Sequence, residues 1–205
     1  MSRVRYGSGD GELIPIIALI IVNLLVYVAI NAYGLVNNLT EQDIEREIIP
    51  YLGLSLSTVM ARPWTIVTSM FTHVSFWHIA SNMVTLYFFG SFLNRITGTR
   101  TFLWIYFGGG LLSALFVLFV FPSFYPTIGA SGAVFALGGA LAVLVPMIKV
   151  FIFPIPVPMP LWVAVLVSFL VLAFISGVSW QGHLGGLLFG LAAGWYLRRR
   201  LRVML

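Results

Sequence analysis

A serine between glycines is the first group in this chain whose setting suits chemistry. Ser131 lies in the segment 129–132, Gly-Ala-Ser-Gly, and begins an apolar run that continues to Val145. A serine in a membrane helix usually donates a hydrogen bond back to its own helix. On a tight turn, flanking glycines instead let backbone and substrate approach closely, which suits a nucleophile. The motif alone is weak, so its interpretation depends on the other polar groups.

His183 is the candidate general base for this serine. Gly186, Gly190 and Gly194 follow it on one helical face, and small residues at that spacing let a second helix approach closely. The best-matched partner is the run after Ser131, which contains Gly132, Ala133, Ala136, Gly139 and Ala140. Docking these faces would place the imidazole beside the hydroxyl, the minimum needed to activate an alcohol. The alternative is a hydrogen-bonded packing histidine.

His78 and Asn82 form a second polar pair, because residues four apart share one helix face. They are candidate donors to a developing oxyanion, together with the Ser131 amide. The alternative is an interhelical hydrogen bond that orients packing. His73, five residues before His78, is expected to bond loop backbone.

The distribution of acids predicts a Ser–His dyad rather than a triad. All six acidic residues lie at or before Glu47, far from Ser131 and His183 in the chain. We therefore expect packing, on Phe135, to orient the imidazole. The sequence has no cysteine and no HExxH motif, and it lacks acids beyond the first loop. These absences disfavour a zinc protease, an aspartyl protease and an ion pathway, and we expect no metal or cofactor.

Composition indicates an all-α polytopic membrane protein. The chain is 60% hydrophobic and only 8% charged, with a mean hydropathy of +1.02, whereas soluble domains carry about 25% charged residues. Its 205 residues allow about six spans of about 20 residues. The net charge of +5 comes from residues at span ends, which indicates membrane orientation rather than nucleic-acid binding.

The expected order is a tail, one six-span domain and a second tail. Residues 1–12 form a polar tail, 13–197 the helical domain with a long first loop at 31–77, and 198–205 a basic tail. The predicted spans are 13–30, 77–93, 102–121, 131–145, 161–175 and 183–197. Both termini are expected on the cytoplasmic side of the cell membrane, because all but two of the basic residues then lie inside. Leu13–Ile30 is too long for a typical cleavable signal.

Two connections carry further signals. Thr40 and Asp43 form a capping box, which predicts a short amphipathic helix over Glu41–Ile49, ended by Pro50. The segment 147–160 carries four prolines and is predicted to be a non-helical connection.

The span that begins at Ser131 is unusually short. From Ser131 to Val145 it reaches about 22 Å, against a hydrocarbon core of about 30 Å. The chain from Pro122 must then descend into the protein as irregular backbone, which is tolerated only where protein or a wet cavity satisfies it. Ser131 is therefore expected to face an outward-opening, water-accessible hollow.

Taken together, the motifs resemble the rhomboid family of intramembrane serine proteases. Three segments on the second, fourth and sixth predicted spans carry the similarity: 78–82 (HIASN), 129–132 (GASG) and 183–190 (HLGGLLFG). The resemblance implies that Ser131 is the nucleophile and His183 the base, and that His78, Asn82 and the Ser131 amide stabilise the oxyanion. It also implies hydrolysis of peptide bonds in or near transmembrane helices of protein substrates in the bilayer, through an acyl-enzyme without a cofactor.

Three positions depart from the commoner family pattern. Trp64-Thr65 replaces a Trp-Arg pair, Phe135 replaces a tyrosine, and Asn94 replaces an acid. The alternatives are a non-proteolytic member of the fold that binds transmembrane segments and, more distantly, a transporter. The helix over Leu161–Ile175 is a candidate gate for substrate, with ordinary lipid-facing packing as the alternative. The natural substrate and the oligomeric state stay open.

Overall fold

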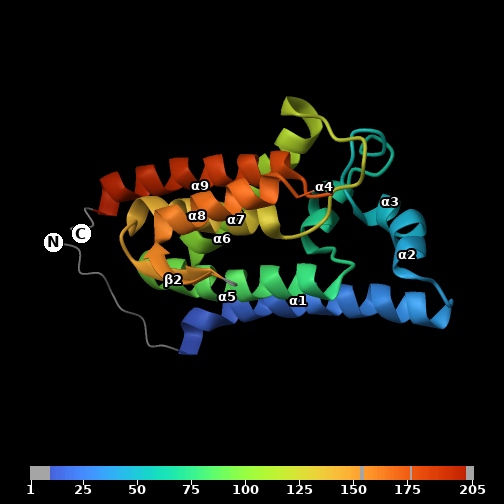
Figure 1. The fold of residues 1–205 in the computed structure, drawn as a ribbon, viewed down its shortest axis with the longest axis horizontal. Helices are drawn as coiled ribbons and strands as arrows, with labels where there is room; N and C mark the ends of the chain where they lie inside the picture. Colours follow the sequence, from blue (N-terminus) through green and yellow to red (C-terminus); the bar gives the residue numbers. More distant parts are fainter. Residues whose placement is uncertain (1–9, 153–154, 176, 202–205) are drawn as a thin grey trace.

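Long helices run side by side along the molecule in the computed structural model, which describes residues 10–152, 155–175 and 177–201 (Figure 1). They are α1 (Asp10–Val36), α5 (Phe76–Thr97), α6 (Thr99–Leu115), α7 (Ser131–Leu144), α8 (Leu161–Ala173) and α9 (Trp180–Leu201). Each predicted span overlaps with one of these helices. By length and composition alone, two of the described helical stretches could cross a bilayer, Leu13–Val36 and Thr99–Val120.

Several boundaries differ from the sequence prediction. Helix α1 continues six residues past Ile30, and α9 runs on through Arg198–Arg200, which we had assigned to the tail. Basic side chains in the last turn of a helix interact favourably with its dipole, so α9 has no reason to end at the apolar boundary. The rest of the two predicted tails, residues 1–9 and 202–205, lies outside the described residues.

Helix α7 is the core of the bundle. Its 14 residues include 11 buried ones, as expected of a helix that is apolar on every face. It contacts α5, α6, α8 and α9. At about 1.5 Å per residue it is only about 21 Å long, so both of its ends lie within the length of its longer neighbours.

The closest helix contact is between α7 and α9, and glycine makes it possible. A methyl group at Gly186 would overlap the Gly132 carbonyl, and one at Gly190 would overlap the Ala136 carbonyl. One turn further on, a methyl group at Gly194 would lie 2.7 Å from the Ala140 oxygen. The predicted docking of the two small-residue faces is therefore what the structure contains.

The segment between α1 and α5 folds into short pieces at one end of the bundle (Figure 1). They are α2 (Glu41–Glu47), α3 (Ile49–Leu52), α4 (Thr65–Thr68) and the 3₁₀ turn η1 (Ser69–Phe71). The predicted capping box is present, and the hydrogen bonds from Thr40 lower the pKa of Asp43. Pro50 does not end α2; it lies in the first turn of α3, where a missing N–H costs nothing.

The connection between α7 and α8 adds a short sheet to an otherwise helical fold among the described residues. It is non-helical as expected, but it forms an antiparallel hairpin of β1 (Lys149–Ile152) and β2 (Ile155–Pro160). Alternating prolines had indicated only the absence of helix. After α6, the five-residue π-helical turn η2 (Phe116–Val120) ends the third predicted span.

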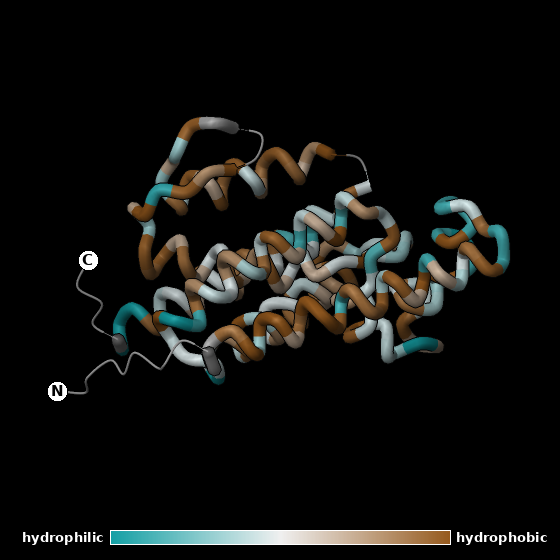
Figure 2. The backbone as a smooth tube through the Cα atoms, turned by 90° about the horizontal axis from the view of Figure 1, so that it is seen from below, coloured by the Kyte–Doolittle hydropathy of each residue, from teal (hydrophilic) through white to brown (hydrophobic). Residues whose placement is uncertain are grey.

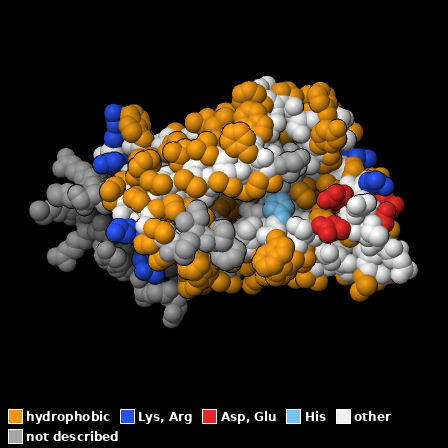
Figure 3. All heavy atoms as spheres, in the orientation of Figure 1, with side chains coloured by type: hydrophobic (Ala, Val, Ile, Leu, Met, Phe, Trp, Pro, Cys, Tyr) orange, Lys and Arg blue, Asp and Glu red, His pale blue; other side chains and the backbone are white. Residues whose placement is uncertain are grey.

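Charge separates along the bundle. Figure 3 shows Lys and Arg gathered at one end, and Asp and Glu with further basic groups at the other. The first end carries Arg198, Arg199 and Arg200 in the last turn of α9. The acidic end carries Glu41 and Asp43 in the first turn of α2. Helices α7 and α9 both begin at the acidic end of the bundle (Figure 1). Ser131 and His183, in the first turns of these helices, therefore lie toward that end.

The glycine contact between α7 and α9 yields a stability prediction. Gly190→Val should lower the free energy of unfolding by about 1–3 kcal/mol or more, because the added side chain meets backbone that cannot yield. A thermal unfolding scan in detergent should show a melting temperature lower by at least about 2–4 °C. Ala192→Val adds bulk to an exposed position of the same helix and is the matched control. Equal melting temperatures for both variants would contradict the packing account.

Candidate active site

Ser131 and His183 meet at the ends of the two most closely packed helices. The Ser131 hydroxyl oxygen lies 2.7 Å from Nε2 of His183, within hydrogen-bond distance. Ser131 is the first residue of α7, so its own N–H belongs to the unpaired first turn of a helix. His183 is buried, with 5% of its surface exposed. This pair has the geometry of an alcohol next to a base.

The imidazole of His183 is held by an aromatic ring. Phe135, one turn after Ser131 on α7, places its ring centroid 4.7 Å from that of His183, with the planes tilted by 34°. Nδ1 of His183 is buried and makes no hydrogen bond to any described residue. No carboxylate orients this ring among the described residues. The described contact of this ring is with Phe135, and a dyad in place of a triad stays a prediction.

His78 lies against the loop that leads into Ser131. A methyl group at Gly129 would lie 2.5 Å from Nε2 of His78, and Gly129 has a φ of +112° that favours glycine. The Asn82 amide nitrogen donates a hydrogen bond to the His78 carbonyl at 2.9 Å, which leaves its second hydrogen for another acceptor. His78 thus lies on the face of α5 that meets this loop, and Asn82 lies one turn further along the same face of the helix.

Three backbone links hold the Ser131 loop to the segment between α1 and α5. The Gly129 N–H donates to the Ser69 carbonyl at 2.8 Å. The Ala130 N–H donates to Nε2 of His73 at 3.4 Å, the loop contact expected of that histidine. Leu54 and Thr127 exchange a pair of backbone hydrogen bonds. Burial lowers the pKa of His73 to about 3, with His78 adding to the effect, so the ring is neutral and can accept.

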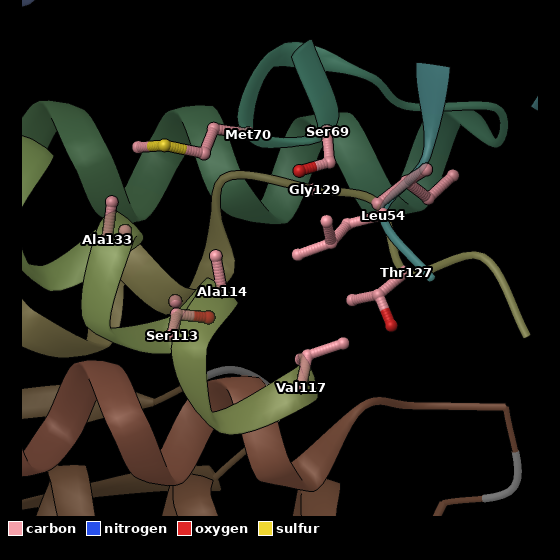
Figure 4. A pocket seen from close by; sticks show the side chains of 12 residues that line it. Leu54, Ser69, Met70, Ser113, Ala114, Val117, Thr127, Gly129 and Ala133 are labelled. Carbon is pink, nitrogen blue, oxygen red and sulfur yellow. The ribbon is translucent and has the colours of Figure 1, made fainter. Parts of the chain in front are cut away.

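The outward-opening hollow expected at Ser131 stays a prediction, and the structure contains a small cavity beside the loop that carries this serine, lined by Gly129 and Gly132 but not by Ser131 itself. Its volume is about 20 Å³, enough for about one water molecule. Gly129, Gly132 and Ala133 line one side, and Ser69 and Ser113 line others. Figure 4 shows the hydroxyls of Ser69 and Ser113 on different walls of this space. Their only sequence signal was polarity in apolar surroundings, since neither belongs to a recognisable motif.

A model of the rhomboid domain matches residues 60–200, well over half of the chain. The chain belongs to the rhomboid family. The resemblance inferred from the three motifs is therefore confirmed, and the rhomboid chain is a membrane-embedded, predominantly helical protein.

Its relatives include bacterial proteins and proteins named as mitochondrial. The rhomboid chain is 34% identical over 146 residues to "Rhomboid protein 1, mitochondrial" of Saccharomyces cerevisiae, covering 66% of the chain and 42% of the yeast protein. It is 30% identical over 147 residues to "Putative rhomboid protease YdcA" of Bacillus subtilis, covering 71% and 70%. It is 33% identical over 132 residues to "Rhomboid protease GluP" of the same bacterium, covering 63% of the chain but 25% of that protein.

In the rhomboid chain, the loop that carries Trp64-Thr65 is tied to α3 by Arg62 and Trp64. Thr65 is fully buried and donates to the Arg62 carbonyl at 2.7 Å. Arg62 donates to the Pro50 carbonyl at 2.9 Å, and its guanidinium lies 4.0 Å from the centre of the Tyr51 ring. Trp64 donates to the Tyr51 carbonyl at 2.8 Å. An arginine three residues earlier thus ties this loop to α3.

The other two departures are Asn94 and Phe135. Asn94 is buried near the end of α5, with 3% of its surface exposed. Phe135 keeps the ring that packs on His183 and also meets Phe169 of α8 edge-on, with centroids 6.1 Å apart. A tyrosine hydroxyl is therefore not needed to stack on the imidazole.

The stacked pair yields a prediction for catalysis. Phe135→Leu should lower the turnover of a membrane-tethered substrate by about fivefold, because an aromatic face stabilises a positive imidazolium by about 1 kcal/mol. Phe135→Tyr keeps the ring and should retain most of the turnover. Purified enzyme assayed with one substrate would measure both. Equal turnover for the wild type and the leucine variant would show that the ring has no such role.

Proposed function

We propose that this rhomboid protein is an intramembrane serine endopeptidase that hydrolyses peptide bonds in or near transmembrane segments of other proteins. The observation that carries the proposal is the 2.7 Å contact between the Ser131 hydroxyl and Nε2 of His183. Its relatives named as rhomboid proteases support the same activity. Transmembrane proteins are the proposed partners, and the bilayer is the setting.

The proposed first half-reaction forms an acyl-enzyme. Nε2 of His183 takes the proton as the Ser131 oxygen attacks the scissile carbonyl. The imidazolium so formed then gives that proton to the leaving amine, which breaks the carbon–nitrogen bond. His183 needs its lone pair on Nε2 at the start, so the neutral ring carries its hydrogen on Nδ1. Packing on Phe135 keeps the ring in that orientation.

The proposed oxyanion site is made of three donors around the serine loop. The Ser131 N–H lies at the start of α7, where the helix dipole also favours negative charge. His78 lies beside Gly129, and Asn82 keeps one amide hydrogen outside its bond to the helix. Donors placed before the reaction stabilise the developing charge without reorganising.

The proposed second half-reaction needs one water molecule at Ser131. Hydrolysis consumes water, which hydrocarbon does not supply, so the protein has to hold it close to the acyl group. The cavity beside Gly129 and Gly132 has room for about one water. The hydroxyls of Ser69 and Ser113 are suitable partners for it. The water oxygen attacks the acyl carbon while His183 takes a proton from it. The ester bond to the Ser131 oxygen then breaks, and His183 gives the proton to that oxygen, which releases the carboxylic acid product.

In the proposed topology the six long helices cross the membrane with both termini on the basic side. Basic residues at the end that carries Arg198–Arg200 favour the inner face. The two shorter apolar helices, α7 and α8, then span with the help of the loops at their ends. Relatives named from bacteria and from mitochondria leave two candidate membranes, and we favour the cell membrane by the distribution of charge.

Helix α8 is the proposed side of substrate entry. It exposes bulky apolar side chains, among them Trp162 and Val171, and Phe174 directly after it is exposed too. Its Phe169 touches Phe135, which in turn stacks on His183. A displacement of α8 would therefore open a path to the dyad without breaking the contact between α7 and α9.

The nucleophile and base can be tested separately. A fluorophosphonate probe should label the wild type and should not label Ser131→Ala, and His183→Ala should abolish cleavage of a membrane-tethered substrate. Ser57→Ala removes an exposed serine from the same end of the molecule and is the control. Labelling that survives in Ser131→Ala would remove this serine as the nucleophile. Binding of transmembrane segments without cleavage by wild type would favour the non-proteolytic alternative.

The oxyanion role of Asn82 makes a graded prediction. Asn82→Ala should lower kcat by about 5- to 150-fold, since losing one donor of several costs about 1–3 kcal/mol. Ser81→Ala, at the next position of α5 with an exposed side chain, should leave kcat within about twofold. Unchanged kcat in Asn82→Ala, with folding intact by circular dichroism, would withdraw the role.

A further inference from the structure

The hairpin between α7 and α8 is apolar and exposed. Met147 and Phe151 each expose 70% of their surface, and Val157 exposes 60%. Lys149, at the base of the hairpin, is the last charged residue before Arg198. A hairpin in water normally carries polar residues on its open face, so this composition requires another environment.

The outer edge of β2 has few backbone N–H groups that could donate a hydrogen bond, because proline has none. Three of its six residues, in the sequence IPVPMP, are proline. Val150 pairs with Met159, and Lys149 pairs with Pro160. Neighbouring residues in an antiparallel strand direct their amides to opposite edges. Because Pro160 cannot donate and the next N–H, of Leu161, is directed to the Ile148 carbonyl, we assign the hydrogen-bonded pair to Val150 with Met159. Pro158 and Pro160 then flank an inward-directed amide, and the register shifts further along, between Val150 and Ile152.

Proline on a free edge has two possible uses, and the remaining residues distinguish them. In water, proline stops an edge from pairing with another strand, usually together with charged side chains. In hydrocarbon, it removes N–H groups that would have no partner. Here the exposed side chains next to the prolines are Phe151 and Val157, and neither is charged. This combination fits hydrocarbon.

The hairpin is continuous with the lipid-facing surface of the bundle. It contacts α8, and Figure 2 shows both on one flank, coloured mainly hydrophobic. The Leu161 N–H donates to the Ile148 carbonyl at 2.8 Å, and Pro160 caps α8. Val150 packs against the main hydrophobic core. One face of the hairpin is thus anchored on the protein, while the other continues the apolar surface of α8.

We propose that the hairpin of β1 and β2 is embedded in the bilayer, with Phe151, Val157 and the proline edge of β2 in contact with lipid acyl chains. It enters the leaflet at the end of the bundle opposite Ser131, since it follows the far end of α7. Because Pro160 leads directly into α8, lipid contact of the hairpin also fixes the inner end of that helix. This inference concerns the membrane-embedded fold and does not depend on the proposed protease activity.

The absence of native cysteine lets single spin labels report on this surface. Phe151→Cys and Val157→Cys, labelled and reconstituted in phosphatidylcholine vesicles, should be relaxed by oxygen at least about threefold more than by a water-soluble nickel chelate, as oxygen concentrates in hydrocarbon. Leu25→Cys on α1, 63% exposed, is the lipid-facing reference, and Glu45→Cys on exposed α2 is the aqueous reference. Circular dichroism checks that each labelled variant keeps its helices.

Labels at 151 and 157 that match the Glu45 reference would overturn the proposal in favour of a solvated hairpin. Labels shielded from both oxygen and nickel would also overturn it, because that pattern means contact with protein, such as a second copy of the chain. Either result would leave the serine-probe test of the dyad unaffected.

The proline edge has its own test within the same system. Pro158→Ala restores one outward N–H, and nickel accessibility of the label at 151 should rise by about twofold or more as the edge moves toward water. Met159→Ala changes the neighbouring, inward-paired position without altering the number of outward donors, and should leave accessibility unchanged. Equal accessibility in the two variants would overturn the role assigned to the prolines.

Discussion

The backbone approach of α7 and α9 is the constraint on which the rest of this structure depends. The Gly186 and Gly190 positions have no room for even a methyl group beside the carbonyls of Gly132 and Ala136. Packing at that distance is set by backbone atoms, which cannot change rotamer, so the relative position of the two helices is fixed. Ser131 and His183 stand at the first turns of these helices. Their 2.7 Å separation is a consequence of glycine contacts that take no part in chemistry.

A second constraint comes from the loop before Ser131, which has to be irregular and buried at once. Its amides at Gly129 and Ala130 bond to Ser69 and His73, and Thr127 pairs with Leu54. The segment between α1 and α5 thus acts as a template for the serine loop, and Arg62 ties that segment to α3. In this chain, which has Thr65 where many family members carry arginine, the donor to the Pro50 carbonyl is Arg62.

The sequence predicted those features that depend on a single residue type or on the regular spacing of residues along one helix. The glycine spacing after His183 indicated which helix it meets, and with it the contact between His183 and Ser131. The capping box gave the start of α2. The sequence could not predict features that depend on where separate segments come together. The cavity between Ser69 and Ser113 needs three elements to be placed first. The hairpin was hidden because proline reports the absence of helix and says nothing about pairing with Lys149–Ile152.

Backbone N–H groups away from water need hydrogen-bond acceptors. The chain meets this requirement in one way near Ser131 and, in the proposed lipid-embedded hairpin, in another. Near Ser131 the irregular amides find acceptors on another segment, which costs a long, well-ordered loop but leaves the N–H of Ser131 directed by the start of a helix. On the outer edge of β2, by contrast, proline occupies positions that would otherwise present outward amides. The first solution preserves donors where a reaction needs them, and the second removes donors where lipid could not satisfy them. A site that requires oriented N–H groups can therefore be built only at the end where loops supply partners, which is the end where the serine lies.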